Sequence, residues 1–117
     1  MTLTFSPALD VATSVDVVTP SRKLRCDEPR YEPGGGGINV ARVAQRLGAD
    51  AVAIAPLGGD RGRLVSDQLA VEGVRVEQIN IDHSIRQSFS VTEESTGNQY
   101  RFVLPPRSDD AARADVP

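Results

Sequence analysis

Residues 33–48 read PGGGGINVARVAQRLG, in which a proline and four glycines lead directly into an apolar pattern. The apolar residues recur at the spacing of one helix face, and they are Ile38, Val40, Val43, Ala44 and Leu47. Gly48 stands where a helix C-cap glycine belongs. We therefore predict that Pro33 and the glycines stop all regular structure, and that a helix then runs to about Leu47.

A glycine run before a helix has two interpretations. Bare backbone lets a ligand come close, and the free N–H groups of the first helical turn attract an anion or a hydroxyl oxygen. A merely flexible loop is the alternative. The segment is not a Walker loop, and it fails the dinucleotide fingerprint, because Gly35-x-Gly37 is followed by Val40 where that fingerprint needs glycine. A dinucleotide-binding domain is therefore disfavoured.

Strands and a second helix are predicted around this segment. Thr2–Phe5 is β-prone, and Ala51–Ala55 is wholly apolar, as is typical of a strand covered on both faces. Arg61–Glu72 follows as a helix that stops at Gly73, and Val74–Ile81 is another strand. Short connections between these elements predict an α/β fold with right-handed crossovers and a parallel sheet.

Other segments favour an exposed sheet. In Val11–Val18, β-branched residues are interspersed with polar ones. Ser21–Tyr31 carries many charged residues, so it can form a strand only if one face of that strand is exposed to solvent (a wet strand) or contacts another chain. Arg86–Glu93 and Asn98–Leu104 are β-prone runs joined by a turn at Gly97, which predicts a hairpin. We expect this hairpin to pair with the earlier wet strands.

The composition is typical of one small domain, and its net charge indicates no general attraction to a highly charged partner. The 117 residues carry 13 Lys and Arg against 16 Asp and Glu, a net charge of -3, which gives no general attraction to nucleic acid or to anionic membranes. Cys26 has no partner for an intrachain disulfide, no apolar run is long enough to span a bilayer, and the first residues lack a basic signal region. Cytoplasm is the expected compartment, and residues 106–117 are expected to be a mobile polar tail.

Several side chains are candidates for a binding site. Asp10 follows the first strand, where open α/β sheets bind ligands, and it suits two sugar hydroxyls or else a turn or cap. Asn39, in the first helical turn, suits a polyhydroxylated ligand or a cap. Lys23 and Arg25 share one face if they lie on a strand, where they suit a phosphate or simply a solvated surface. Arg86 has the same two interpretations.

Two further residues are predicted to take no part in metal binding or catalysis. His83 has no second His or Cys nearby, so a metal site is not expected. Cys26 has no partner base in the sequence, and we interpret it as a packing residue rather than a nucleophile.

Four motifs together resemble the ribokinase-like (pfkB) carbohydrate kinases, and within them the minor 6-phosphofructokinase branch. The motifs are SPALD at 6–10, KLRC at 23–26, EPGGGGINVAR at 32–42 and QYRFV at 99–103. The related 1-phosphofructokinases and tagatose-6-phosphate kinases usually carry Lys where this chain has Gly36. The resemblance covers about residues 1–105.

The resemblance implies the N-terminal portion of a Rossmann-like ribokinase fold, with a small β-lid at about 11–31 and 86–104 that often forms a homodimer contact. It implies phosphoryl transfer from MgATP to the C1 hydroxyl of fructose 6-phosphate in a complete protein. The implied sugar-phosphate residues are Asp10, which would hold the sugar hydroxyls, Gly35, Gly36, Gly37 and Asn39 in the same pocket, and Arg86 at the 6-phosphate. Lys23 and Arg25 would add positive charge from the lid, toward a neighbouring subunit or a nucleotide.

The family's second pattern, a Gly-Ala-Gly-Asp segment far downstream, is missing from the sequence. In the family that segment supplies the aspartate base and the N–H groups that stabilise the transferred phosphoryl group, and the ATP site belongs to the same half. We therefore expect the chain to be the N-terminal part of such a kinase, inactive by itself and without strong MgATP binding of its own. The alternative is a stand-alone, non-catalytic dimeric module that binds a sugar phosphate.

Overall fold

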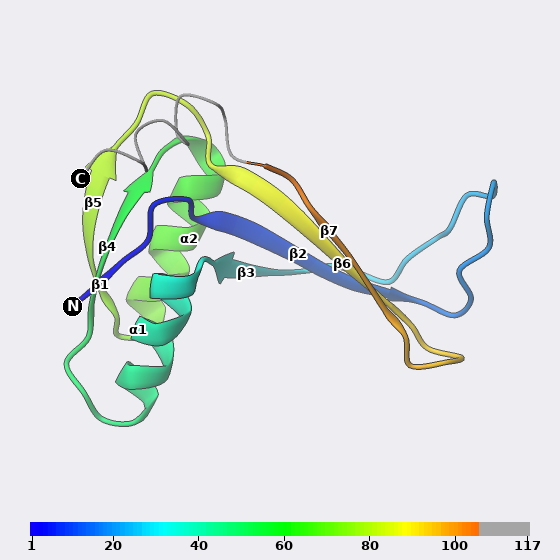
Figure 1. The fold of residues 1–117 in the computed structure, drawn as a ribbon, viewed down its shortest axis with the longest axis horizontal. Coiled ribbons are helices and arrows are strands. Elements are labelled where there is room, and N and C mark those ends of the chain that lie inside the picture. The colour runs from blue at the N-terminus through cyan, green and yellow to red at the C-terminus, as the bar shows by residue number, and fades with distance from the viewer. Residues whose placement is uncertain (106–117) are drawn as a thin grey trace.

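The computed structural model describes residues 1–105, so the tail predicted at 106–117 lies outside the described residues. These residues form two sheets and two helices (Figure 1). The elements in chain order are β1 (Thr2–Leu3), β2 (Ala8–Val15), β3 (Arg30–Gly34), α1 (Gly36–Arg46), β4 (Val52–Leu57), α2 (Gly59–Val71), β5 (Arg75–Asn80), β6 (Arg86–Glu93) and β7 (Gln99–Val103).

The predicted parallel sheet is confirmed. It has the order β1-β4-β5, and both of its strand pairs are parallel. Figure 1 shows α1 and α2 on the same side of this sheet. Residues of β4 alternate accordingly, because Ala53, Ala55 and Leu57 are buried while the residues between them are only half-buried.

The core lies between this sheet and the two helices. Its fully buried members include Ile38 of α1, Leu57 of β4, and Val65 and Leu69 of α2. Burying each such side chain contributes about 1.5–3 kcal/mol. The predicted helix stops are also confirmed, because Gly48 follows the C-cap of α1 and donates its N–H to the Gln45 carbonyl, while Gly73 does the same to Ala70 after α2.

The second sheet, called the lid sheet here, has the order β3-β2-β6-β7. β2 pairs with β6 in parallel, and the hairpin partners β6 and β7 are antiparallel. The predicted pairing of the hairpin with an earlier wet strand is therefore confirmed. In Figure 1 the lid sheet extends away from the helices as a long, twisted arm.

One predicted lid strand is wrong. Ser21–Tyr31 was expected in a sheet, but the chain leaves β2 at Val15 and enters β3 only at Arg30. The connection is an exposed loop, since its charged residues have no sheet face to occupy. It is anchored by Asp27, whose N–H donates to the Ser14 carbonyl at 2.9 Å and whose carboxylate accepts from the Ser14 hydroxyl at 2.8 Å.

Boundaries around the glycine run also differ from the prediction. Pro33 does not stop regular structure, because it lies within β3, an edge strand in which a missing N–H costs little. The following helix begins at Gly36, two residues before Ile38. Cys26, expected to be a packing residue, is exposed in the loop before β3.

Glu93 connects two loop segments at the far end of the lid sheet. Its carboxylate accepts hydrogen bonds from the Thr96 hydroxyl and, at 2.6 Å, from the Val18 N–H. These two bonds, that from Thr96 above all, hold the pKa of Glu93 below its ordinary value of 4.5, because they stabilise the ionised form. The start of the exposed loop is thereby fastened to the β6–β7 turn.

This geometry predicts that the end of the lid sheet near Glu93 loses stability in acid. A carboxylate with a lowered folded-state pKa stabilises the fold fully above about pH 4.5, and that contribution is lost as the pH falls through the folded-state value. We expect the amide NMR resonance of Val18 to titrate with a midpoint below 4.5, and Glu93→Gln to abolish the titration. Glu94→Gln, at the exposed neighbouring position, should leave it unchanged, and a midpoint at or above 4.5 would contradict the assignment.

Candidate functional site

Asp10 lies within β2, on the polar face of the lid sheet. The sequence placed it after the first strand of the parallel sheet, and this is wrong because β1 ends at Leu3 and a new sheet has begun by Ala8. Its carboxylate accepts a hydrogen bond from the Ser88 hydroxyl on β6. A Cβ atom on Gly34 would lie only 2.5 Å from Asp10 Oδ2, so glycine at this position makes room for the carboxylate.

Polar side chains from four strands surround Asp10. Strand register aligns Arg30, Ala12, Ser90 and Arg101 in one row across the sheet, next to a row that contains Glu32, Asp10 and Ser88. Successive residues of a strand point to opposite faces, so these two rows share one face. They line a hollow of about 250 Å³.

The lining of the hollow combines several kinds of hydrogen-bonding group. Two guanidinium groups supply donors and positive charge, two carboxylates accept, and the serine hydroxyls do both. Gln99 reaches across from β7 and donates to Ser90 Oγ at 3.0 Å. Such a mixture suits a polyhydroxylated ligand that also carries a negative group, since the carboxylates bind hydroxyls and the arginines bind an anion.

The glycine run connects this face to α1. Gly35 is the N-cap residue, no side chain of its own caps the helix, and the Thr4 hydroxyl accepts the Ile38 N–H at 2.9 Å instead. A Cβ on Gly37 would lie 2.5 Å from the Leu3 carbonyl oxygen, whereas one on Gly36 would meet nothing within 4 Å. Gly36 therefore borders open space while Gly37 is held against the backbone.

Asn39 is exposed in the first turns of α1. The capping alternative for its side chain is wrong, because Gly35 occupies the N-cap position. Its amide group remains accessible from solvent near the glycine run.

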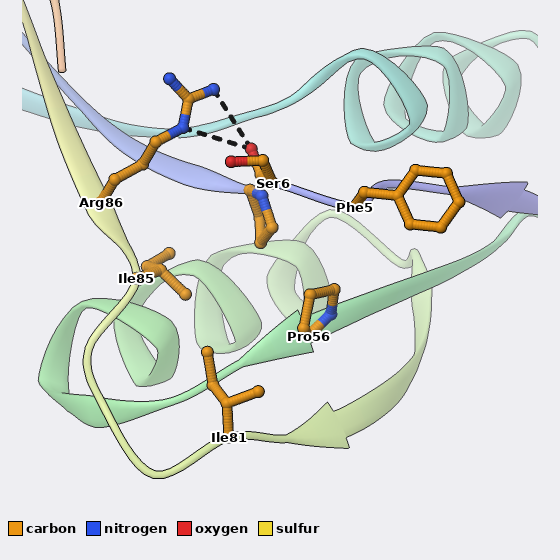
Figure 2. Close-up of a pocket in the computed structure, with 7 residues that line it drawn as sticks. Phe5, Ser6, Pro56, Ile81, Ile85 and Arg86 are labelled. Carbon is orange, nitrogen blue, oxygen red and sulfur yellow. Dashed lines mark hydrogen bonds between the residues drawn. The ribbon is translucent and has the colours of Figure 1, made fainter. Parts of the chain in front are cut away.

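Arg86 lies at the junction of the two sheets, at the start of β6. Figure 2 shows its guanidinium directed at the loop after β1, where Nε and Nη2 donate to the Ser6 carbonyl at 3.3 and 3.2 Å. Nη1 donates to the Leu104 carbonyl at 2.9 Å. An arginine has five N–H donors, so two of them remain for an anion.

Lys23 and Arg25 do not join these residues within one chain. Both are exposed in the loop between β2 and β3, and the expectation that they share a strand face is wrong. In Figure 1 this loop lies at the far end of the lid sheet from α1.

Sequence reasoning missed most of the residues that line the hollow with Asp10. They are Arg30, Glu32, Ser88, Ser90, Gln99 and Arg101. An alternation of period two was the available signal, because on each strand two polar residues flank one aromatic residue, namely Tyr31, Phe89 or Tyr100. Which strands pair, and therefore which polar pairs meet, is not visible in that pattern.

Two kinds of feature are absent from the described residues. Among residues 1–105, no three His, Cys, Asp or Glu side chains are grouped so as to hold a metal ion. Neither helix in that part of the chain is long and apolar enough to cross a membrane.

Comparisons with known proteins agree on one family. The profile of the pfkB family of carbohydrate kinases matches residues 6–116. An ATP-dependent 6-phosphofructokinase isozyme 2 from Mycobacterium tuberculosis is 54% identical over 105 residues, which is 90% of this chain and 31% of that relative. The chain therefore spans about a third of this curated relative, which it matches in the N-terminal part.

Solved structures give the same result. Phosphofructokinase-2 from Escherichia coli in complex with fructose-6-phosphate is similar with a TM-score of 0.87 and 42% identity, over 97% of this chain and 40% of that chain. The tetrameric inhibited form of the same E. coli enzyme matches with a TM-score of 0.86, also at 42% identity, over 97% of this chain and 40% of that chain.

The contrast between Gly36 and Gly37 is testable, because both lie in the first turn of α1. We expect Gly36→Ala to leave the free energy of unfolding unchanged or to raise it by up to about 1 kcal/mol, since alanine favours helix and the space is open. Gly37→Ala should lower it by about 1–3 kcal/mol, because the added methyl group meets backbone. Urea unfolding of the two variants measures the difference, and equal effects would contradict the geometry.

Proposed function

This chain belongs to the pfkB family of carbohydrate kinases, and from that membership we propose that it forms the sugar-phosphate-binding and lid portion of an ATP-dependent 6-phosphofructokinase. In the complete kinase the γ-phosphoryl group of MgATP passes to the C1 hydroxyl of fructose 6-phosphate. The chain presented here supplies the acceptor side of that reaction.

The observation that carries the proposal is the Asp10 carboxylate on the polar face of the lid sheet. Gly34 leaves space beside it, and the surrounding hollow offers both hydroxyl acceptors and guanidinium groups. We assign to Asp10 the hydroxyl groups of the sugar, because an ionised carboxylate accepts two such hydrogen bonds at once. The glycines Gly35, Gly36 and Gly37, together with Asn39, border the same ligand in this proposal.

The 6-phosphate is assigned to Arg86. Its guanidinium keeps two N–H donors beyond the three used on the Ser6 and Leu104 carbonyls, and a rigidly held fork suits bidentate binding of a phosphate. Arg30 and Arg101 add positive potential at the hollow. Phosphoryl transfer requires that the acceptor sugar be held in position and that its negative charge be balanced. We assign both tasks to these residues.

MgATP and the catalytic base are assigned to the part of the kinase beyond this chain. Residues 1–105 contain no Walker loop and no grouped metal ligands that would fit the nucleotide's magnesium. When bound, MgATP supplies the phosphoryl group. This chain's residues hold the sugar so that its hydroxyl faces the nucleotide.

Replacing Asp10 tests the sugar assignment. We expect Asp10→Asn to weaken binding of fructose 6-phosphate about 10-fold or more, because the amide cannot accept as the charged carboxylate does. Isothermal titration calorimetry on the 117-residue chain measures the dissociation constant. Asp67→Asn, on the exposed surface of α2, is the matched control and should bind as the unchanged chain does. Equal affinities for Asp10→Asn and the control would contradict the assignment.

The apolar face of the lid sheet supports a second proposal, a homodimer through the lid. Register aligns Tyr31, Val11, Phe89 and Phe102 in one row, opposite the polar face. Tyr31 is 48% exposed and Phe102 is 58% exposed. The row of residues therefore crosses four strands and has an uncovered aromatic ring at each end. We further propose that Lys23 and Arg25, exposed in the loop between β2 and β3, add positive charge toward this second copy.

Sedimentation velocity tests this dimer. We expect the 12.5 kDa chain to sediment with twice that mass, and Phe102→Asp to give the monomer, because a carboxylate cannot be buried in an apolar contact without a partner. Val43→Asp on α1, where the valine is 51% exposed, is the matched control and should remain dimeric. A monomeric unchanged chain, or a dimer that survives Phe102→Asp, would rule out the lid contact.

A further inference from the structure

The polar hollow of the lid sheet contains two rows of different chemistry. The inner row, on the side of the glycine run, presents the carboxylates of Glu32 and Asp10. The Ser88 hydroxyl belongs to this row and already donates to Asp10. The outer row lies two residues further along the strands, about 7 Å away, and has Arg30 and Arg101 at its two ends. The inner row therefore accepts hydrogen bonds, whereas the outer row carries positive charge.

The outer row has the shape of a cradle. Arg30 lies on β3 and Arg101 on β7, the two edge strands, so their Cα atoms are about 14 Å apart across three strand spacings. Between them the row holds only Ala12 and Ser90, whose side chains are short. Both arginines line the same hollow of about 250 Å³. A long side chain at each end of a floor of small residues leaves room for a compact group between the two guanidinium groups.

The donors of the outer row are available to a ligand. In the part of the chain that the structure describes, no hydrogen bond or ion pair engages the side chain of Arg30 or Arg101, and Glu32 makes no ion pair with its neighbour Arg30. Ser90 Oγ accepts from Gln99 at 3.0 Å, so the Ser90 hydroxyl proton is still available to an acceptor. Two guanidinium groups and one hydroxyl suit a phosphate group, which offers several acceptor oxygens and negative charge.

Arg86 lies on the other side of the inner row. On β6 it precedes Ser88 by two residues and Ser90 by four, so it shares their face of the sheet. Its row and the outer row are therefore about 13 Å apart, with Asp10 between them. Along the strands the face thus presents a guanidinium group, then a carboxylate, then a pair of guanidinium groups. This order matches a polyhydroxylated ligand that carries an anionic group at each end.

We propose that the outer row is a second phosphate subsite, which binds the phosphate at carbon 1 of a hexose 1,6-bisphosphate while Arg86 binds the phosphate at carbon 6. The proposal rests on the proposed function for the identity of the sugar and for the role of Arg86. Its own content is the separate subsite formed by Arg30, Arg101 and Ser90. The chain then binds the product of the proposed reaction more tightly than the monophosphate substrate. Because bound product occupies Asp10, it competes with the next acceptor sugar.

Isothermal titration calorimetry with two sugars tests the proposal. We expect the 117-residue chain to bind fructose 1,6-bisphosphate at least about 10-fold more tightly than fructose 6-phosphate, because a second set of charge-assisted hydrogen bonds is added. Arg101→Gln and Arg30→Gln should each remove most of this preference and leave the affinity for fructose 6-phosphate unchanged. Arg63→Gln, on the exposed surface of α2, removes the same charge and is the matched control that should keep both affinities. Equal affinities for the two sugars, or a preference that survives both variants, would overturn the subsite.

Inorganic phosphate provides a readout that does not depend on the sugar. We expect it to shift the side-chain Nε–H NMR resonances of Arg30 and Arg101 but not that of Arg63. It should bind at least about 10-fold more weakly than the bisphosphate, because it makes no contact with Asp10. Unmoved Arg30 and Arg101 resonances would overturn the subsite. Inorganic phosphate that binds as tightly as the bisphosphate would overturn the assignment of a sugar ligand to it.

The readouts distinguish failure of this proposal from failure of the proposed function. Fructose 6-phosphate binding that Asp10→Asn weakens, without a preference for the bisphosphate, keeps the sugar assignment and overturns the subsite. A bisphosphate preference that depends on Arg101, with no effect of Asp10→Asn on either sugar, keeps the subsite and contradicts the assignment of Asp10. A chain that binds neither sugar contradicts both.

Discussion

The close packing of the glycine run against residues 3–10 is the constraint on which the structure depends. Gly37 lies against the Leu3 carbonyl, Gly34 lies against the Asp10 carboxylate, and Thr4 accepts the Ile38 N–H between them. Each contact requires that no side chain stand in the way. Through them the N-terminus of α1, the end of β1 and the start of β2 are held at one point.

That point is also where the two sheets separate. β1 belongs to the parallel sheet and β2 to the lid sheet, and only four residues connect Leu3 to Ala8. Arg86 braces the same junction from the other strand, by donating to the Ser6 and Leu104 carbonyls. Because both connections are short and hydrogen-bonded, Asp10 and the glycine run keep a defined relation to each other. A binding site at this junction is therefore preorganised by backbone contacts rather than by flexible side chains.

Each of the two sheets leaves one face exposed, and the two exposed faces differ in character. The aromatic row of the lid sheet faces away from Asp10, so a partner there would leave the polar hollow open. The face of the parallel sheet opposite the helices instead combines Leu3 and Ile54 with the charged side chains of Arg75 and Glu77 on β5. The first surface is the proposed dimer contact, and the second lies on the far side of the parallel sheet from α1 and α2.

Local patterns in the sequence determined both helices, β4, β5 and the β6–β7 hairpin. Helical spacing and the glycines at 48 and 73 act within a few residues, so neighbours along the chain are enough to specify these elements. The same local patterns misplaced Ser21–Tyr31, whose charged residues resemble a wet strand but have no strand beside which to pair.

Only the tertiary structure decided the site. The parallel pairing of β2 with β6 joins residues nearly eighty positions apart and brings Ser88 to Asp10. It also selects Arg30 and Arg101 for the same face and directs Arg86 to the Ser6 carbonyl. Periodicity shows which residues of one strand share a face, whereas the choice of neighbouring strand depends on contacts between distant segments. The sequence alone therefore determined the elements and the family resemblance, while long-range sheet pairing decided which polar side chains meet.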